Sequence, residues 1–347
     1  LEVGDYDELK TDKRAYARAF SIQYKNTDSV HGKAIIEYYG DKMLVQNPPM
    51  PPLEREELDW VYSLPYARKY HPIYEKDGGV PGIAEVAFSV THNRGCFGGC
   101  NFCALAFHQG RAVRSRSIES CVKEAEQIAA MPDFKGYIHD VGGPTANFRY
   151  PACKKQLSDG VCSARKCLSP TPCKNLVADH TEYIKLIEAI EALPRVKKVF
   201  IRSGIRFDYL LADPDESFFK KLVRDNVSGQ LKVAPEHCSS AVLRCMGKPD
   251  FSVYQKFRKR YFELTKSFGK EQQIVSGAFL LRFIRHAPEE RHKAPHGLRR
   301  DVEMAFELVT AAVGGFKEEK GVESGETPQG AQVIFEVGVI EHDVEHP

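Results

Sequence analysis

The 347-residue sequence lacks several features that would place it at once in a particular class of protein. It contains no uninterrupted apolar run of the ~18 residues that a transmembrane helix needs, and no charged-then-apolar leader opens it. The formal net charge is only +2, so the chain as a whole gives no electrostatic indication of a nucleic-acid or membrane partner. These absences predict a cytoplasmic protein with no membrane partner, and nucleic acid is not indicated.

The residues that are present suffice for a folded core. Hydrophobic residues make up 42% of the chain and charged residues 28%, and the length predicts one large domain or two smaller ones. Ten cysteines in a chain of this kind indicate a reducing compartment, where they are thiols or metal ligands. Leu1 is not a natural initiator, which predicts that the chain is a fragment of a longer protein.

Three of the cysteines, Cys96, Cys100 and Cys103, stand close together in one short segment. Three residues separate the first pair, two of them glycines that let the loop turn tightly, and two residues separate the second pair. Closely spaced thiolates hold iron–sulfur clusters, and three ligands on a four-iron cluster leave one iron open. Structural zinc is the alternative, but such sites close the metal with four ligands, typically in two separated pairs. The spacing therefore favours an iron–sulfur site.

This spacing, with Phe102 directly before the last cysteine, resembles the signature of the radical S-adenosylmethionine (radical SAM) enzymes. The segments Asn93–Cys100, Gly142–Asn147 and Val233–His237 resemble the YgiQ-type branch of that family, and the resemblance extends to about Val275. It implies that the three cysteines hold a 4Fe–4S cluster and that S-adenosylmethionine (SAM) binds the open iron through its amino and carboxylate groups.

The resemblance also implies an activity. An electron from the cluster would cleave SAM to methionine and a deoxyadenosyl radical, which abstracts hydrogen from a substrate that the sequence does not identify. A reductant such as a flavodoxin or ferredoxin would supply the electron. The alternatives are a non-catalytic metal-binding or RNA-associated module, with zinc or iron–sulfur, and an inactive fragment of a radical SAM enzyme.

Positions for SAM follow from the same comparison. Gly142 and Gly143 come after a predicted strand, where a glycine pair lets the backbone approach a ligand closely. The resemblance implies that this loop receives the SAM amino group. Phe102 is assigned to the cofactor site on the resemblance alone.

Two later strand ends supply further candidates. Arg202 and Ser203, with Arg206 close behind, could face the SAM carboxylate or ribose, although a structural salt bridge is an equal alternative for the arginines. Glu236 follows the fourth predicted strand, where its carboxylate could accept hydrogen bonds from ribose hydroxyls.

The fold class that the pattern predicts is α/β. From Ile83 onward, apolar strand-like runs alternate with helical patterns, which indicates βα units and a parallel sheet. The predicted strands are Ala84–Thr91, Gly136–Val141, Lys198–Ser203, Gly229–Ala234 and one that begins near Gln273. The resemblance implies a partial (βα)6 TIM-like barrel of the radical SAM kind, whose chemistry lies at the carboxyl ends of the strands. Five units can be counted, and the last is missing or altered.

Three regions are expected along the chain. Residues 1–82 form an N-terminal segment and linker, with a helix over Tyr6–Tyr24, a hairpin over Ala34–Val45 and a short helix over Leu53–Tyr62. Residues 83–278 form the radical SAM core barrel. Residues 279–347 form a divergent C-terminal tail that departs from the family pattern. A shift of the reading frame is one explanation, and it leaves open whether the SAM adenine pocket is complete.

A second group of four cysteines, Cys153, Cys162, Cys167 and Cys173, lies in a later loop. Their separations of eight, four and five residues are not a standard zinc-finger pattern. A second metal site, with zinc or an auxiliary cluster, and reduced thiols in a surface loop are both open. Arg111, Arg114 and Arg116 form a short basic run that is expected on a solvated face, with a phosphate or carboxylate contact as the alternative.

Overall fold

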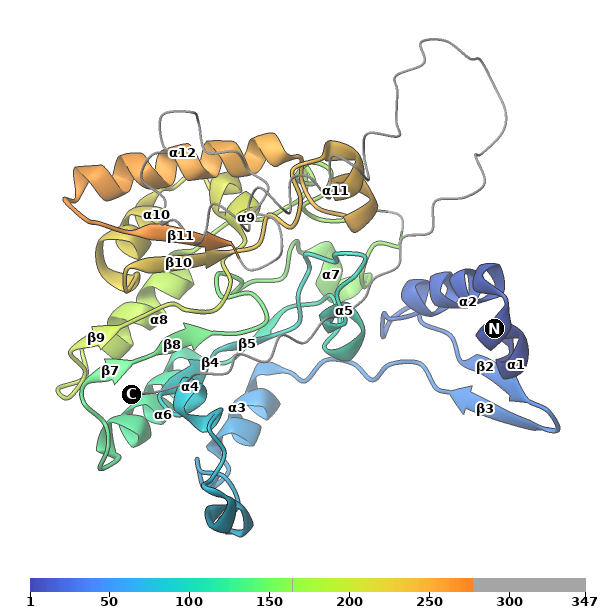
Figure 1. Cartoon of the computed structure of the whole chain (residues 1–347), viewed down its shortest axis with the longest axis horizontal. Coiled ribbons are helices and arrows are strands. Elements are labelled where there is room, and N and C mark those ends of the chain that lie inside the picture. The colour runs from blue at the N-terminus through green and yellow to red at the C-terminus, as the bar shows by residue number, and fades with distance from the viewer. Residues whose placement is uncertain (164, 277–347) are drawn as a thin grey trace, which may run out of the picture. The chain divides into compact units, whose positions relative to one another are not determined.

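The computed structural model describes residues 1–163 and 165–276, all of which belong to one compact unit (Figure 1). It is a mixed α/β structure, as the alternating pattern predicted. The predicted tail, residues 279–347, and the altered last unit lie outside the described residues.

The N-terminal part is a small sheet with two helices. Its elements are β1 (Glu2–Asp5), α1 (Tyr6–Thr11), α2 (Lys13–Lys25), β2 (Ile35–Tyr39) and β3 (Lys42–Gln46). Strand β1 pairs parallel to β2, and β2 pairs antiparallel to β3 around Gly40, whose φ of 61° suits a tight turn. The hairpin prediction is confirmed. The single predicted helix is divided at Asp12, whose carboxylate accepts a hydrogen bond from the Arg14 N–H and so begins α2.

Helix α3 (Arg55–Ser63) and a 3₁₀ helix (Pro72–Asp77) connect this part to the first core strand. The predicted strand over Ala84–Thr91 is wrong in its first half, because Ile83–Val86 forms the helical turn α4 and strand β4 covers only Ser89–Thr91. A short apolar run has too few residues for its period to separate a strand from a helix.

The core strands pair in parallel and in chain order (Figure 1). Strand β4 pairs with β8 (Asp140–Gly142), β7 (Tyr137–Ile138) with β9 (Lys198–Val199), and β10 (Gln230–Val233) with β11 (Gln273–Ser276). The Val141 N–H donates to the Phe200 carbonyl at 3.2 Å, and a parallel bridge joins Ile205 to Val233. These contacts connect the pairs into one series from β4 to β11. No pairing among the described strands joins β11 back to β4.

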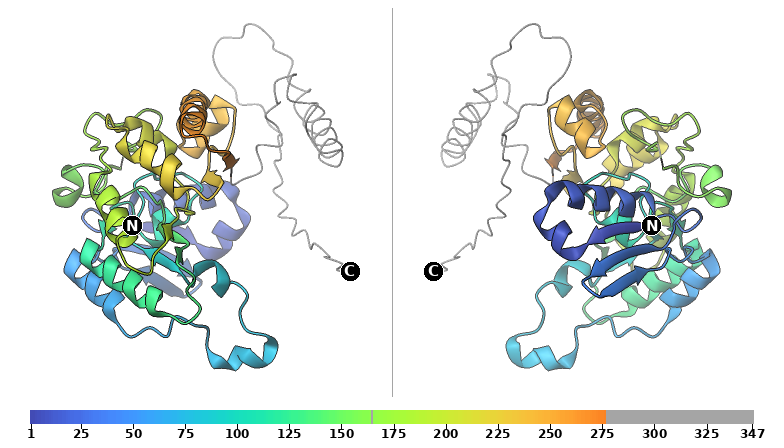
Figure 2. Two further views of the ribbon diagram at one scale, coloured as in Figure 1. Left: turned by 90° about the vertical axis from the view of Figure 1, so that its left-hand side faces the viewer. Right: turned by 90° about the vertical axis from the view of Figure 1, so that its right-hand side faces the viewer.

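Helices between these strands bury their apolar sides against the series. They are α6 (Ile118–Ala130), α8 (Thr181–Glu191), α9 (Phe207–Ala212), α10 (Ser217–Lys221), a π turn (Leu222–Asn226), α11 (Ser240–Met246) and α12 (Phe251–Ser267, orange in Figure 2). One core cluster joins Ile138 and Val199 of the strands to Ile128, Leu186 and Phe257 of the helices. Burial of each such side chain stabilises the fold by about 1.5–3 kcal/mol.

Two predictions about α6 are confirmed. The Ser117 hydroxyl accepts a hydrogen bond from the Ser120 N–H at 3.0 Å and caps the helix. Cys121 is fully buried in the core cluster, as a packing residue should be.

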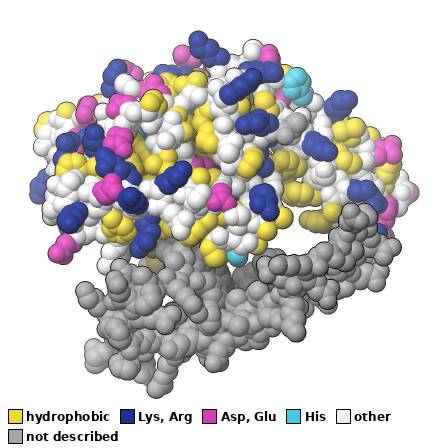
Figure 3. Space-filling view, turned by 90° about the horizontal axis from the view of Figure 1, so that it is seen from above, with side chains coloured by type: hydrophobic (Ala, Val, Ile, Leu, Met, Phe, Trp, Pro, Cys, Tyr) yellow, Lys and Arg dark blue, Asp and Glu magenta, His cyan; other side chains and the backbone are white. Residues whose placement is uncertain are grey.

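The surface that Figure 3 draws carries lysine and arginine side chains interspersed with aspartate and glutamate. This mixture is consistent with the small net charge of the sequence. None of the described helices combines the length and the apolar character needed to cross a membrane.

Candidate metal and cofactor site

The loop that carries Cys96, Cys100 and Cys103 leaves the series directly after β4. A short antiparallel ladder between β5 (Asn93–Arg94) and β6 (Arg114–Ser115) closes its base. Within the loop, the Cys96 N–H donates to the Gly110 carbonyl at 3.1 Å. Gly95 has a φ of 80°, and a Cβ there would overlap the Ala112 carbonyl oxygen. The tight course of the loop at this point therefore requires glycine.

Polar side chains from the loop after β8 and from the start of α9 contact two of the three thiols. The Cys96 sulfur lies 3.3 Å from the Thr145 hydroxyl, and the Arg206 guanidinium donates to the Cys100 sulfur at 3.3 Å. Burial raises the pKa of the Cys96 thiol, while the Thr145 hydrogen bond and the Arg206 charge lower it. Asp208 fixes Arg206 with two hydrogen bonds of 2.7 and 2.6 Å. A fixed cation and a hydroxyl beside the sulfurs suit thiolate ligands.

The rest of the loop is anchored through Phe97 rather than Phe102. The Phe97 ring is fully buried and stacks on Phe148 with centroids 3.7 Å apart, while Phe102 is 53% exposed. The Asn101 N–H donates to the Met246 carbonyl at 2.9 Å, which ties the loop to the end of α11. The cofactor role of Phe102 stays a prediction.

The thiols of Cys96, Cys100 and Cys103 are of the kind that binds an iron–sulfur cluster, but their side chains are not grouped as metal ligands. Across residues 1–163 and 165–276, no three His, Cys, Asp or Glu side chains are grouped so that they could hold a metal ion. Three free thiols on one loop, two of them with donors at their sulfurs, nevertheless fit the donor set of a cluster with one open iron.

A cavity of about 460 Å³ opens beside this loop, at the carboxyl ends of β4 and β8. It brings together four of the predicted residues, Gly142, Gly143, Arg202 and Ser203. The other lining residues are Glu85, Val86, Ser89, Val90, Thr91, Arg94, Gln109, Asp140, Pro144 and Lys232. Their charges have both signs, which suits a ligand that carries an ammonium and a carboxylate.

Close packing explains the glycine pair. A Cβ at Gly142 would overlap the Ser203 hydroxyl, and a Cβ at Gly143 would overlap the Asn93 side-chain oxygen. That oxygen is buried and has no hydrogen-bond partner in the described part of the chain. Only glycine therefore lets the loop after β8 lie this close to β5 and to Ser203.

Asp140 is a functional candidate that the sequence reasoning missed. Its carboxylate accepts hydrogen bonds from the Arg202 N–H at 2.8 Å, the Ser203 N–H at 3.0 Å and the Ser203 hydroxyl. It stands two residues before Gly142, so both lie on the same face of the strand. That period-two relation was the available signal.

The predicted Glu236 does not line the cavity. It follows β10 with an unusual φ of 69° and forms an ion pair with Lys248 at 3.5 Å. Its role at the ribose therefore stays a prediction. The structural salt bridge that was one alternative for Arg206 is present, with Asp208 as its partner. The same guanidinium also contacts the Cys100 thiol.

The expectation of a solvated arginine run is wrong for two of its three members. Arg111 and Arg116 are buried, with 6% and 1% of their surface exposed. Arg116 forms an ion pair with Glu124 and lies over the Tyr62 ring, 4.0 Å from its centroid. These partners offset the cost of burying the charge, which a charge count along the sequence does not reveal.

The second group of cysteines shares one loop region between β8 and α8. The pKa of the Cys167 thiol is raised to about 11, chiefly by burial; the Arg111 charge lowers it, and the Cys153, Cys162 and Cys173 thiols contribute to the rise. The Cys173 N–H donates to the Cys167 carbonyl at 2.8 Å. All four are free thiols, and in the described residues no three of them are grouped as ligands of one metal ion.

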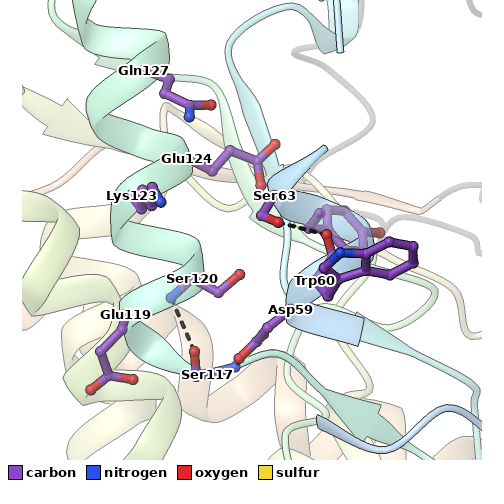
Figure 4. Close-up of a pocket in the computed structure, with 10 residues that line it drawn as sticks. Asp59, Trp60, Ser63, Ser117, Glu119, Ser120, Lys123, Glu124 and Gln127 are labelled. Atoms are coloured by element: carbon purple, nitrogen blue, oxygen red, sulfur yellow. Dashed lines mark hydrogen bonds between the residues drawn. The ribbon is translucent and has the colours of Figure 1, made fainter. Parts of the chain in front are cut away.

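Another cavity, of about 350 Å³, lies between α3 and α6 (Figure 4). Asp59 and Ser117 meet at its floor, where the Ser117 N–H donates to the Asp59 carboxylate at 3.0 Å. Trp60, Ser63, Glu119, Ser120, Lys123, Glu124 and Gln127 complete the walls together with Tyr62. It is lined by no cysteine and by none of the predicted site residues.

Comparisons with known proteins indicate the family of the chain. Residues 1–89 match the family described as Radical SAM N-terminal. UPF0313 proteins of Clostridium botulinum (strain 657) and Clostridium perfringens (strain 13) are 54% and 56% identical to this chain, each over 275 residues. Each alignment covers 79% of this chain but only 43% and 42% of these relatives.

The protein is thus one with a radical SAM N-terminal domain. More particularly, it belongs to the UPF0313 family, the YgiQ type that its motifs indicated. It spans less than half the length of the curated relatives it matches.

Proposed function

We propose that this chain is the cofactor-binding part of a radical SAM enzyme. Cys96, Cys100 and Cys103 would hold a 4Fe–4S cluster, and the cavity at the strand ends would bind SAM. One observation carries the proposal, the course of the loop Gly142–Thr145. Its first three residues line the cavity, and its fourth contacts the Cys96 thiol. A single loop therefore joins the two halves of the proposed site.

The strand arrangement supports the same function. Parallel strands that neighbour one another in chain order are what successive βα units produce. We propose that they belong to a partial (βα)6 TIM-like barrel. The cysteine loop and the cavity then occupy the carboxyl ends of the strands, where barrels of this kind carry out their chemistry.

Each charged group at the site has a role in this proposal. When bound, the reduced cluster supplies the electron that cleaves SAM and releases a deoxyadenosyl radical. Arg206 and Thr145 stabilise the thiolates that they contact. Arg94, Arg202 and Lys232 attract the carboxylate of SAM into the cavity. The Asp140 carboxylate attracts the SAM ammonium group.

The partners remain proposals as well. A small redox protein such as a flavodoxin or ferredoxin would reduce the cluster, and the substrate is unassigned. Regions that the longer relatives have beyond this chain would contribute to substrate choice.

The test is anaerobic reconstitution with iron and sulfide, reduction with dithionite and addition of SAM. We expect a changed electron paramagnetic resonance spectrum on SAM binding and deoxyadenosine in the chromatogram. The spectrum reports SAM binding even if cleavage needs the rest of the longer protein. A cluster that forms but whose spectrum SAM leaves unchanged would contradict the proposed SAM site.

A further inference from the structure

The loop between β8 and α8 is long and contains little regular structure. Only the short helix α7 (Lys155–Ser158) lies within the part that carries the four later cysteines. Backbone hydrogen bonds hold it at a few points, among them Val177 N–H to the Ala152 carbonyl at 2.8 Å. Loops of this length inside a compact unit are usually functional, and a cross-link is one way to order them. All four cysteines are free thiols, so disulfides do not provide one.

We propose that Cys153, Cys162, Cys167 and Cys173 form a second, closed metal site that holds a Zn²⁺ ion through four thiolates. Four protein ligands complete a tetrahedral shell, which is the mark of a structural site. None of these cysteines lines the cavity at the strand ends. The site is therefore separate from the proposed cluster and needs no open position. This inference does not depend on SAM cleavage.

Hydrogen bonds within the loop connect the segments that carry these cysteines. Gln156 connects two of them, because its N–H donates to the Cys153 carbonyl at 3.1 Å and its side-chain amide lies 3.9 Å from the Cys167 sulfur. The Cys173 N–H donates to the Cys167 carbonyl. Cys162 is exposed. In the described residues no three of these thiols are grouped as ligands of one ion, so metal binding would draw them together.

A buried cation stands beside this group without a full set of partners. Arg111 donates to the carbonyls of Cys162 at 3.2 Å and Arg165 at 3.4 Å. Its Nε–H is buried and has no hydrogen-bond partner among the residues that the structure describes. Four thiolates around Zn²⁺ carry two net negative charges. Arg111 supplies a compensating charge beside the Cys162 backbone.

The proposed zinc site would also support the first cysteine loop. One apolar cluster contains Phe97, Ala152 and Leu168, and both Cys96 and Cys167 pack against it. Ala152 and Leu168 directly precede and follow zinc ligands, Cys153 and Cys167. The metal would hold them against Phe97, the anchor of the cluster loop.

The experiment uses the full chain with Cys96, Cys100 and Cys103 all changed to Ala, which removes the proposed cluster ligands. Metal analysis of the purified protein should find about one zinc per chain. Replacement by Co²⁺ should give the charge-transfer absorption of a tetrahedral thiolate site. Protein without retained metal, or with iron and acid-labile sulfide in place of zinc, would overturn the proposal.

A ligand substitution at an exposed position separates metal binding from folding. Cys162→Ser changes an exposed thiol and should weaken zinc binding by at least ~100-fold, measured by competition with a chelator. Cys238→Ser changes an exposed thiol outside the loop and should leave zinc affinity unchanged. Equal affinities in these two variants would also overturn the proposal.

Discussion

The two cysteine-bearing loops of this chain pack against the same apolar cluster but differ in what surrounds their thiols. The loop of Cys96, Cys100 and Cys103 receives a hydroxyl from the loop after β8 and a guanidinium from the start of α9, and it stands beside a cavity. None of the four later cysteines lines either cavity described above, and the buried Arg111 donates to the Cys162 carbonyl. Three ligands beside a cavity suit an open, reactive metal site, whereas four ligands away from one suit a closed structural site.

The largest effect should come from loss of a ligand in the first loop. In the proposed site, Cys100→Ala leaves two thiolates, so the cluster should not assemble and deoxyadenosine should fall to the background of unreconstituted protein. Cys121→Ala is the matched control, because that buried thiol packs in the core and should leave both signals intact. Visible absorption and chromatography measure the outcome. Full cluster absorption in Cys100→Ala protein would refute the assignment.

The next effect tests the cation that distinguishes the first loop. Arg206→Lys keeps the charge but loses the two-pronged contact with Asp208 and the reach to the Cys100 sulfur. We expect deoxyadenosine formation to slow by about 10–100-fold, as for other groups that support metal ligands. Arg224→Lys changes an exposed arginine paired with Asp225 at 2.8 Å and should have no measurable effect. Similar rates in the two variants would remove Arg206 from the site.

A smaller effect should follow from a single added methyl group. Gly143→Ala places a Cβ against the buried Asn93 side-chain oxygen, and such overpacking costs about 1–3 kcal/mol of the free energy of unfolding. Gly204→Ala is the control, since nothing lies within 4 Å of a Cβ there. Urea unfolding should separate the variants, and the SAM-dependent spectral change should weaken only in Gly143→Ala. Equal stabilities would show that the loop after β8 can shift without cost.

Much of the fold could be predicted from the sequence, because residues that are buried on one face of a helix or strand recur with the period of that element. The apolar face of α6, its Ser117 cap and the hairpin turn at Gly40 depend on local rules, and the structure has them. The helical turn Ile83–Val86 was mistaken for a strand because an apolar run that short has no readable period. The predicted helix over Tyr6–Tyr24 is two helices, because the Asp12 side chain caps the start of the second one.

Residues of the candidate site could be predicted only where a pattern within one short segment of the sequence indicated them. The cysteine spacing and the glycine pair are local, and the structure places the pair in a cavity beside the cysteine loop. Asp140 and Thr145 act on residues 63 and 49 positions away, so no local pattern pointed to their partners. The burial of Arg116 likewise depends on Glu124 and Tyr62, which fold rather than spacing brings together.

The smallest expected effect concerns the hydroxyl that links the cavity loop to the first thiol. Thr145→Val keeps the shape of the side chain but removes its hydrogen bond to the Cys96 sulfur, 3.3 Å away. One such bond contributes about 1 kcal/mol, so deoxyadenosine formation should fall by roughly fivefold. Thr145→Ser retains the hydroxyl and should restore most of the rate, whereas a purely packing role would leave Thr145→Val the more active of the two. Because Thr145 directly follows the residues that line the cavity, this pair of variants asks whether the SAM loop acts on the cluster ligand through one atom or through its packing alone.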